Sequence, residues 1–477
     1  MSSLAMAQTR CPPREYASGV RDRSEQPSMT AETSAVATVA AADGVCACGA
    51  AHDAPCATLR ERVGDSAVAA AKPVLRVRQR YWVVTASHLV ADLYPPFVLS
   101  LAVALTADLG LSKRQMALLF AFNPIASGLS QPVFAWITDR FDTRVFGPLG
   151  LAICAICLSS IGFATSFGQL VALQVGGMIG VGMLHPVLAA LAGELGAGRK
   201  PARARSARGL ALSIFFAAGM VGGVTGPIVA TRINEHIGLV YLAVMAIPGV
   251  LFAGALAVAT LGVPHRPHAH HDAARHKAYI RLGVEGRIAL VALFVSNAMR
   301  FTVNIGLFYL FAQWAAARVA DADRASSLTG DVIASAQMGM GVSALFFGWV
   351  VHAGRERTPL VLSGLLAAPA VALMAIAPSG AMHALAFVAA LGFFGMIPQS
   401  IAAAQRLLPA STGVAGSVMM GCGWFVSAIG PEIVKIAIER FGGLTGAFLT
   451  LAILMALAGL VGLLIPRTAL ERSGAQR

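Results

Sequence analysis

Hydrophobic positions along this chain fall into long continuous runs. From Tyr81 to Ile465, apolar runs of about 20 residues follow one another, separated by charged or Pro/Gly-rich junctions. A helix of that length crosses the ~30 Å hydrocarbon core of a bilayer. Barrel-type strands of alternating polarity are absent from the sequence, and a helix satisfies its own backbone N–H and C=O groups within lipid. The pattern therefore predicts an all-α integral membrane protein.

The junctions divide this region into about twelve predicted transmembrane helices. Their centres lie near Leu93, Ile125, Cys154, Gly180, Gly219, Val250, Arg300, Gly341, Ala367, Phe394, Trp424 and Ile453. Lysine and arginine concentrate before the first run, in every second junction and after the last run. Because loops rich in basic residues stay in the cytoplasm, we expect both termini to be cytoplasmic.

Composition supports a membrane protein and argues against one class of partner. The chain has 477 residues, of which 57% are hydrophobic and only 12% charged. Its mean hydropathy of +0.71 is far above that of soluble domains. The net charge of +13 follows the predicted topology, so it indicates contact with the bilayer and argues against a nucleic-acid partner.

Two polar segments lie outside the apolar runs. Residues 1–80 mix Ser, Ala, Thr and Arg without a periodic apolar face and are predicted to be a disordered cytoplasmic tail. Cys46, Cys48 and Cys56 lie there beside His52, but their spacing matches no standard zinc pattern. Residues 263–287 are rich in His and Arg; a solvated linker is favoured there over metal binding or pH sensing. We expect neither a metal site nor a cofactor.

An internal repeat relates the fifth predicted helix to the eleventh. GLALSIFFAAGMVGGVTGP, from Gly209 to Pro227, and GVAGSVMMGCGWFVSAIGP, from Gly413 to Pro431, share glycine, serine and a final Gly-Pro in one register. The shared positions include Gly219, Gly226 and Pro227, which recur as Gly423, Gly430 and Pro431. Close packing alone would explain single glycines, but the shared register indicates helices that flex and slide in equivalent places.

The repeat predicts two six-helix bundles of the kind that secondary transporters use. The predicted parts are a tail at 1–80, bundles at 81–262 and 288–465, a linker at 263–287 and a tail at 466–477.

A second repeated segment closes the second and eighth predicted helices. AWITDRFDTR, from Ala135 to Arg144, resembles the loop motif G-x-x-x-D-R-x-x-x-R/K of the major facilitator superfamily. GWVVHAGRER, from Gly348 to Arg357, is its counterpart in the second half. Charges at helix ends can hold one conformation and separate in another. The predicted latch consists of Asp139, Arg140 and Arg144, with His352 in the place of an acid in the second copy.

The first predicted helix contains the unusual stretch SHLVADLYPPF. His88 and Asp92 are four residues apart and therefore share one helix face. Asp92 falls near the bilayer midplane, where a carboxylate costs at least about 2.5 kcal/mol and is expected to face a cavity or a partner. Pro95 and Pro96 remove two backbone donors and predict a break or kink just beyond it. This arrangement predicts proton coupling by Asp92 and His88.

Further polar residues within the membrane are candidates for substrate binding. They are Arg300, Asn297, Asn304 and Tyr309 in the seventh helix, His185 in the fourth and Gln399 in the tenth. Asp92 and Arg300 could pair across a central cavity, either as part of the site or as a purely structural ion pair. His185 could instead be satisfied by a backbone carbonyl, and Tyr309 could be only an aromatic lining. Asn123-Pro124 and Gln131-Pro132 are interpreted as kinked positions rather than as ligands.

At these residues the sequence resembles the fosmidomycin-resistance family of the major facilitator superfamily, over most of residues 81–465. The matching features are Ser87-His88-x-x-x-Asp92, Gln131-Pro132 with Thr138-Asp139-Arg140, His185-Pro186, Ser213 with Gly226-Pro227, Phe308-Tyr309-Leu310, and Ala404-Gln405 with Leu408-Pro409. The resemblance implies a proton-coupled exporter that confers resistance to an anionic phosphonate antibiotic. Val187 and Arg406 depart from it, because the family pattern has acids there.

These observations predict a monomeric secondary transporter of a bacterial inner membrane, working by alternating access. We expect a proton antiporter that expels a small organic or drug-like, possibly anionic, molecule. Proton-coupled uptake of an organic anion, with Arg300 as its clamp, is the alternative. A non-transporting sensor with this fold is a third hypothesis. An enzyme is disfavoured, because the sequence has no G-x-x-x-x-G-K-S/T loop and the HxxxD pair lies within a repeated transporter architecture.

Overall fold

The computed structural model describes residues 75–138, 145–196, 201–260, 283–408 and 412–475. The chain divides into two units, Met1–Val68 and Ala69–Arg477, and all described residues belong to the second. Every regular element among them is helical, so the prediction of an all-α protein is confirmed. The predicted tail at 1–80, except its last residues, and nearly all of the linker at 263–287 lie outside the described residues.

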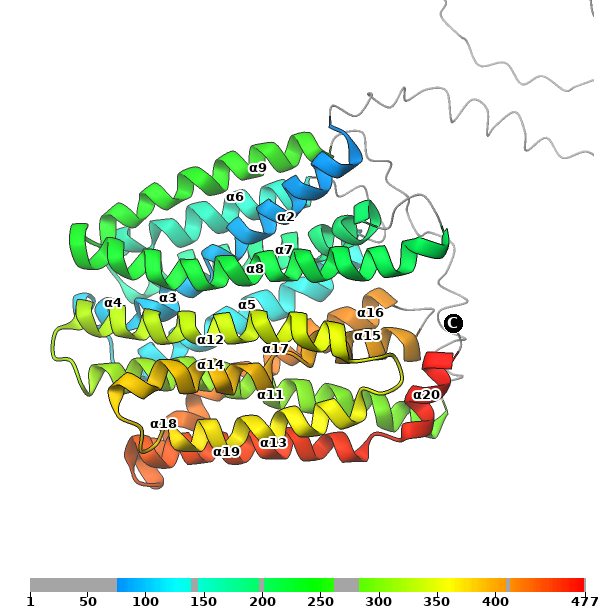
Figure 1. Ribbon diagram of the computed structural model, residues 1–477. Helices are drawn as coiled ribbons and strands as arrows, with labels where there is room; N and C mark the ends of the chain where they lie inside the picture. Colours follow the sequence, from blue (N-terminus) through cyan, green and yellow to red (C-terminus); the bar gives the residue numbers. More distant parts are fainter. Residues whose placement is uncertain (1–74, 139–144, 197–200, 261–282, 409–411, 476–477) are drawn as a thin grey trace, which may run out of the picture. The chain divides into compact units, whose positions relative to one another are not determined.

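The first half of the bundle runs from α2 to α9 (Figure 1). Its elements are α2 (Val77–Leu93), α3 (Pro96–Ser100), α4 (Ala102–Asp108), α5 (Lys113–Thr138), α6 (Phe146–Ser159), η1 (Ser160–Phe163), α7 (Phe167–Gly196), α8 (Pro201–Ile237), η2 (Leu239–Met245) and α9 (Ala246–Thr260).

The second half runs from α11 to α20. Its elements are α11 (Val284–Ala316), α12 (Ala322–Val350), α13 (Arg357–Leu373), η3 (Ser379–Ala381), α14 (Met382–Phe393), α15 (Ile397–Leu407), α16 (Thr412–Ser417), η5 (Val418–Cys422), α17 (Gly423–Val426), η6 (Ser427–Ile429), α18 (Gly430–Arg440), α19 (Gly443–Val461), η7 (Gly462–Leu464) and α20 (Arg467–Ala475).

The apolar helices agree with the hydropathy pattern. Within the described ranges, 10 helices are long and apolar enough to cross a membrane, and an eleventh results if the bent pair α2–α3 and α4 counts as one span. Helix α13, with 17 residues, is apolar but slightly shorter. Each of the twelve predicted centres falls in a different one of these segments.

The two halves meet along two seams. In one seam α8 lies beside α12, and in the other α5 lies beside the segments η5, α17 and η6. Gly128 of α5 and Gly421 of η5 allow backbones to touch there, because a Cβ on Gly128 would collide with the Gly421 carbonyl. One buried core lies wholly within the first half, and another is built mostly from the second.

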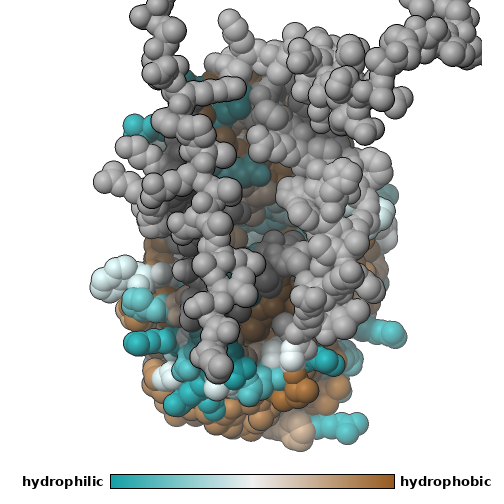
Figure 2. All heavy atoms as spheres, turned by 90° about the vertical axis from the view of Figure 1, so that its right-hand side faces the viewer, coloured by the Kyte–Doolittle hydropathy of each residue, from teal (hydrophilic) through white to brown (hydrophobic). Residues whose placement is uncertain are grey.

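The start of α2 and the helix α20 lie at the same end of the bundle, which we call the terminal end; the opposite end is the distal end (Figure 1). Figure 2 looks onto the terminal end; where the grey atoms leave it visible, hydrophilic side chains gather in its lower part and hydrophobic residues cover the flanks. Large apolar side chains such as Leu366 and Ile376 are exposed on those flanks. An apolar girdle of this kind is suited to lipid contact.

The first span is interrupted where the two prolines predicted it. α2 ends at Leu93 and α3 begins at Pro96, and a further bend of 50° separates α3 from α4. The amide of Asn123 on α5 donates to the Pro95 carbonyl (2.9 Å), and Gln174 on α7 donates to the Asn123 oxygen (2.7 Å). Asn123 therefore satisfies the break in a neighbouring helix, as a buried polar group should.

The sequence repeat is also a repeat of packing. Gly226 of α8 lies against the Leu93 carbonyl of α2, and Gly430 at the start of α18 lies against the Thr302 carbonyl of α11. The two copies differ in backbone, however. α8 is one continuous helix, whereas its counterpart contains a π-helical turn at Val418–Cys422 and a 3-10 turn at Ser427–Ile429.

Candidate functional site

His88, Asp92 and His185 form one buried cluster, which we call the triad. His88 and Asp92 come from successive turns of α2, and His185 comes from α7. One Asp92 oxygen lies 3.0 Å from Nε2 of His185, and the other lies 3.3 Å from Nε2 of His88. His88 and Asp92 lie together as their spacing predicted, and His185 joins them. Proton coupling by the first two residues and substrate binding by His185 stay predictions.

Both imidazole rings are oriented by backbone carbonyls. Nδ1 of His88 lies 2.8 Å from the Phe215 carbonyl, and Nδ1 of His185 lies 2.9 Å from the Val181 carbonyl. A carbonyl only accepts, so each Nδ1 must carry a hydrogen. In a neutral ring with its hydrogen on Nδ1, the Nε2 atom therefore presents a lone pair to Asp92. A further proton, on Nε2 or on the Asp92 oxygen, turns this contact into a hydrogen bond. The triad can therefore share up to two protons between Asp92 and the rings.

The surroundings separate a buried part of the triad from an accessible part. The His88 side chain is 1% exposed and stacks on Phe215 of α8, with ring centroids 3.9 Å apart. Asp92 and His185 are each 15% exposed. Gly219 of α8 closes the site, because a Cβ there would collide with the Asp92 carboxylate and the His88 ring. On the α6 side the Cys154 thiol contacts the Ala91 carbonyl (3.9 Å).

Among the described residues, the triad is the group whose ligand atoms could hold a metal ion, with one such atom from each residue all within 4.8 Å of one another. The same geometry suits a shared proton, because the nitrogen to oxygen separations are those of hydrogen bonds and charge-assisted pairs.

Arg300 corrects one hypothesis from the sequence. It is completely buried in the second half and donates to the carbonyls of Gly392 (2.7 Å) and Leu360 (2.5 Å). Asp92 faces two histidines, so the Asp92–Arg300 pair is not formed in this structure. Hydropathy could not reveal which way Arg300 points, because α11 is apolar on most of its surface and its rotation depends on the neighbouring helices.

The other polar candidates lie in or near the second-half core. Asn297 accepts a hydrogen bond from Ser400 (2.8 Å), and Tyr309 is buried with its ring 5.3 Å from that of Phe120. Asn304 is 1% exposed, and its amide finds no partner among the described residues. Gln399 is partly buried on α15. Substrate binding by these residues stays a prediction.

The predicted latch is only partly visible. Asp139, Arg140 and Arg144 lie outside the described residues, and His352 is exposed, with Nδ1 3.0 Å from the Val350 carbonyl. One residue of the second copy of the motif belongs to a charge pair that the sequence did not predict. Glu356, almost completely buried at the start of α13, pairs with Arg406 of α15. The acid is thus four residues beyond the position where the motif predicted one.

A polar network joins the halves at the distal end, and we call it the distal lock. Arg232 at the end of α8 binds Asp331 of α12 through both carboxylate oxygens (2.8 and 3.1 Å). The amide of Asn234 donates to Asp323 (2.7 Å). Glu235 accepts from Ser327 of α12 (2.5 Å) and pairs with Arg232 (3.1 Å). The sequence-based predictions did not include this network.

The helical architecture and the repeated halves define a polytopic membrane transporter of the two-bundle type. Comparison gives the family: residues 93–431, well over half of the chain, match the model of the Major Facilitator Superfamily. The chain therefore belongs to the major facilitator superfamily, a family of transporters rather than enzymes.

Three curated relatives are informative. The chain is 28% identical over 157 residues to the fosmidomycin resistance protein of Escherichia coli strain K12, covering 32% of this chain and 36% of that one. It is 30% identical over 167 residues to the phosphoglycerate transporter protein of Salmonella typhimurium, covering 34% and 35%. A longer match, 23% identical and covering 80% and 90%, is to the MFS-type transporter YfnC of Bacillus subtilis. The first two matches span about a third of each relative.

Solved structures share the fold. A bacterial homologue of the lysosomal transporter Spinster superposes with a TM-score of 0.58 at 17% identity, covering 85% of this chain and 98% of that one. A D-xylose–proton symporter superposes with a TM-score of 0.61 at 16% identity, covering 82% and 98%. At these identities the likeness establishes the architecture alone. It confirms the predicted fold.

Proposed function

We propose that the protein is a proton-coupled secondary transporter in which the triad carries the coupling proton. The observation behind this proposal is the orientation of the two histidines, whose Nε2 atoms both face Asp92. Removing a proton from either contact leaves a nitrogen lone pair against a carboxylate oxygen, which is repulsive. The loaded and unloaded triads therefore favour different geometries, as coupling requires.

Helix α8 is the route by which the triad would act on the bundle. Phe215 and Gly219 of α8 contact His88 and Asp92, and Arg232 and Glu235 near its end form the distal lock with α12. A shift of α8 against α2 would therefore move Arg232 and Glu235 relative to α12 and strengthen or weaken the distal lock. Rocking of two halves about a central site is how transporters of this architecture alternate access.

We propose that the terminal end is cytoplasmic, in accordance with the basic junctions, and that the membrane is a bacterial inner membrane. The distal lock then closes the external side in this conformation. For the transported molecule we propose a small organic anion moved outward, with the fosmidomycin resistance protein among the relatives as support. The phosphoglycerate transporter relative favours uptake of an organic anion as a second candidate.

The test is a proton-flux assay in proteoliposomes, with internal pH followed as anionic and cationic compounds, including fosmidomycin and phosphoglycerate, are added. We expect substrate-dependent flux in the wild type and background flux in Asp92→Asn. Asp108→Asn, an exposed acid at the end of the same span, is the matched control and should keep the flux. Undiminished flux in Asp92→Asn would overturn the proposal.

A further inference from the structure

The triad has the separations that a metal ion requires. One ligand atom from each of His88, Asp92 and His185 lies within 4.8 Å of the other two. The Nε2 atoms of the two histidines lie 3.3 and 3.0 Å from the carboxylate oxygens. Around a tetrahedral zinc ion with bonds of about 2.0–2.2 Å, neighbouring ligand atoms are about 3.4 Å apart. The three side chains therefore lie close to the arrangement in which one ion contacts all of them.

Both histidines are held in the orientation of metal ligands. Nδ1 of His88 donates to the Phe215 carbonyl (2.8 Å), and Nδ1 of His185 donates to the Val181 carbonyl (2.9 Å). Histidines that bind a metal through one ring nitrogen usually donate the other N–H to a carbonyl or a carboxylate, which fixes the tautomer and aims the free lone pair. The two carbonyls thus direct both Nε2 lone pairs toward Asp92.

The charge and the donor atoms of the triad indicate which cation it would take. Among the residues that the structure describes, Asp92 pairs with His88 and His185 and with no lysine or arginine. A carboxylate within a membrane span needs a compensating charge, which here has to come from protons or from a bound cation. Two imidazoles and one carboxylate suit zinc and the neighbouring first-row metals, whereas magnesium and calcium prefer oxygen ligands alone.

The packing around the triad leaves one side open to an ion. Asp92 and His185 are each 15% exposed, whereas His88 is buried and its ring stacks on Phe215. α8 closes the other side, because a Cβ on Gly219 would collide with the Asp92 carboxylate and the His88 ring. An ion would therefore enter past Asp92 and His185, and water on that side could complete its coordination, as in open zinc sites.

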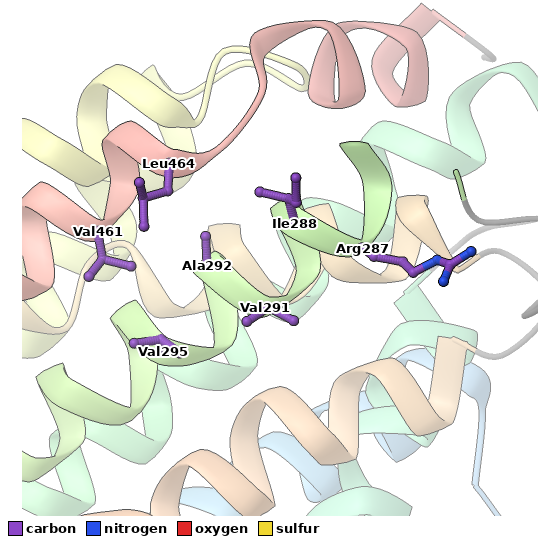
Figure 3. Close-up of a pocket in the computed structure, with 7 residues that line it drawn as sticks. All are labelled: Arg287, Ile288, Val291, Ala292, Val295, Val461 and Leu464. Carbon is purple, nitrogen blue, oxygen red and sulfur yellow. The ribbon is translucent and has the colours of Figure 1, made fainter. Parts of the chain in front are cut away.

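A groove elsewhere in the described residues offers no such ligands. It has a volume of about 340 Å³ and lies on the flank of the second half, between α11 and α19 (Figure 3). Its lining is aliphatic except for Arg287 and contains no carboxylate, imidazole or thiol. Metal binding is therefore expected at the triad and not in this groove.

We propose that the triad is a binding site for one divalent transition-metal ion, represented by zinc, with His88, Asp92 and His185 as its ligands. The sequence predicted no metal site, because His185 is 93 residues from Asp92 and no short motif joins them. Metal binding itself does not depend on proton coupling. One consequence rests on the proposed function: zinc would use the lone pairs that hold the shared protons, so it should stop proton flux.

The test is thermal unfolding of the purified full chain, stripped of metal with a chelator and then titrated with zinc. An ion that binds the folded triad stabilises the folded state, so zinc should raise the unfolding temperature of the wild type. In Asp92→Asn and His185→Ala the zinc concentration needed for this rise should increase about a hundredfold. His236→Ala, an exposed histidine at the end of α8, is the matched control and should respond like the wild type.

The variants separate lost coordination from a damaged fold. Asp92→Asn keeps the shape of the ligand, and unfolding without zinc checks the stability of each variant. The cysteines of residues 1–80 and the histidines of residues 263–287 are present in every sample, so ions bound there affect all variants alike. The absence of a zinc-dependent rise in the wild type, or an equal rise in Asp92→Asn and His185→Ala, would overturn the proposal.

Proton flux measured with and without zinc distinguishes this proposal from the proposed function. Stabilisation by zinc without loss of flux would support the metal site and contradict proton coupling by the triad. Flux that requires Asp92, in a protein that zinc does not stabilise, would support proton coupling and overturn the metal site.

Discussion

Gly219 in the first half and Gly423 in the second occupy equivalent places in the repeat, but their neighbours differ completely. Gly219 of α8 lies against the Asp92 carboxylate and the His88 ring. Gly423 of α17 lies against Phe301, whose ring meets that of Trp424 edge-on at 5.0 Å. The same helix contact thus holds titratable groups in one half and an aromatic pair in the other. At this helix crossing, titratable side chains are therefore present in the first half and replaced by an aromatic pair in the second.

The second half does contain a buried charge, but of another kind. Arg300 donates to carbonyls within its own half and stays fully buried, whereas Asp92 is partly exposed. A satisfied, inaccessible guanidinium ties helices together, while an accessible carboxylate shared by two histidines can exchange a proton.

Replacing Arg300 should affect stability far more than coupling. Arg300→Met leaves the carbonyls of Leu360 and Gly392 without their donor, and we expect a loss of about 3 kcal/mol in the free energy of unfolding. Thermal unfolding in detergent measures the loss, and proton flux per folded molecule measures coupling. Loss of flux in a fully stable variant would instead place Arg300 in the coupling site, and its role would then not be structural.

The two equivalent glycines provide a matched pair of substitutions. In Gly219→Ala the new Cβ collides with Asp92 and His88, so we expect about 2 kcal/mol of destabilisation together with strongly reduced proton flux. In Gly423→Ala the nearest atom is 3.4 Å away, at Phe301, and the effect should stay within about 0.5 kcal/mol. Equal loss of flux in both variants would mean that packing at these crossings, rather than the triad, limits transport.

His185→Gln tests the role of the accessible histidine. Glutamine can still donate a hydrogen bond to Asp92, but it cannot carry the proton. We expect roughly tenfold slower proton flux and a weaker dependence of flux on pH between 5 and 8, where histidine titrates. Flux is measured over that range in the wild type and in Gln169→Glu, a surface variant of the same helix. A pH profile identical to the wild type would remove His185 from the coupling group.

The distal lock is expected to have the smallest effect. Asp331→Asn removes the charge that Arg232 binds, at a cost of about 1 kcal/mol for a partly exposed pair, which shifts the balance of conformations about fivefold. Spin labels at Gly168, in the first turn of α7, and at Gly380, in η3 of the other half, would report a longer or broader distance. Arg324→Gln, an exposed charge at the same end, serves as the control. An unchanged distance would show that the pair of Arg232 and Asp331 does not hold the two halves together at the distal end.

The sequence predicted most where the lipid environment permits only helices. Apolar runs have to become helices, so each predicted centre falls in a separate apolar helical segment, with Phe394 at the turn between α14 and α15. The pairing of His88 with Asp92 follows from their spacing along one helix. The sequence predicted least where the rotation of a helix and long-range packing determine which side chains meet. Nothing local shows that His185 of α7 faces α2, that Arg300 turns into its own half, or that Glu356 meets Arg406.

The distal lock illustrates a signal that was present but not used. Arg232 and Glu235 are three residues apart at the end of an apolar helix, on a side of the membrane where basic residues are sparse. A charge pair in such a place suggests a partner on another helix, here Asp331 and Ser327 of α12. Charges at span ends can therefore be partners as well as markers of topology.

In the proposed mechanism Asp92 gains and loses the coupling proton. Infrared difference spectroscopy of the purified full chain, recorded as pH is stepped, detects the carbonyl stretch of a protonated carboxylic acid and its shift in heavy water. We predict such a band in the wild type and in Asp108→Asn, and its absence in Asp92→Asn. An unchanged band in Asp92→Asn would show that another carboxylic acid, and not Asp92, is protonated.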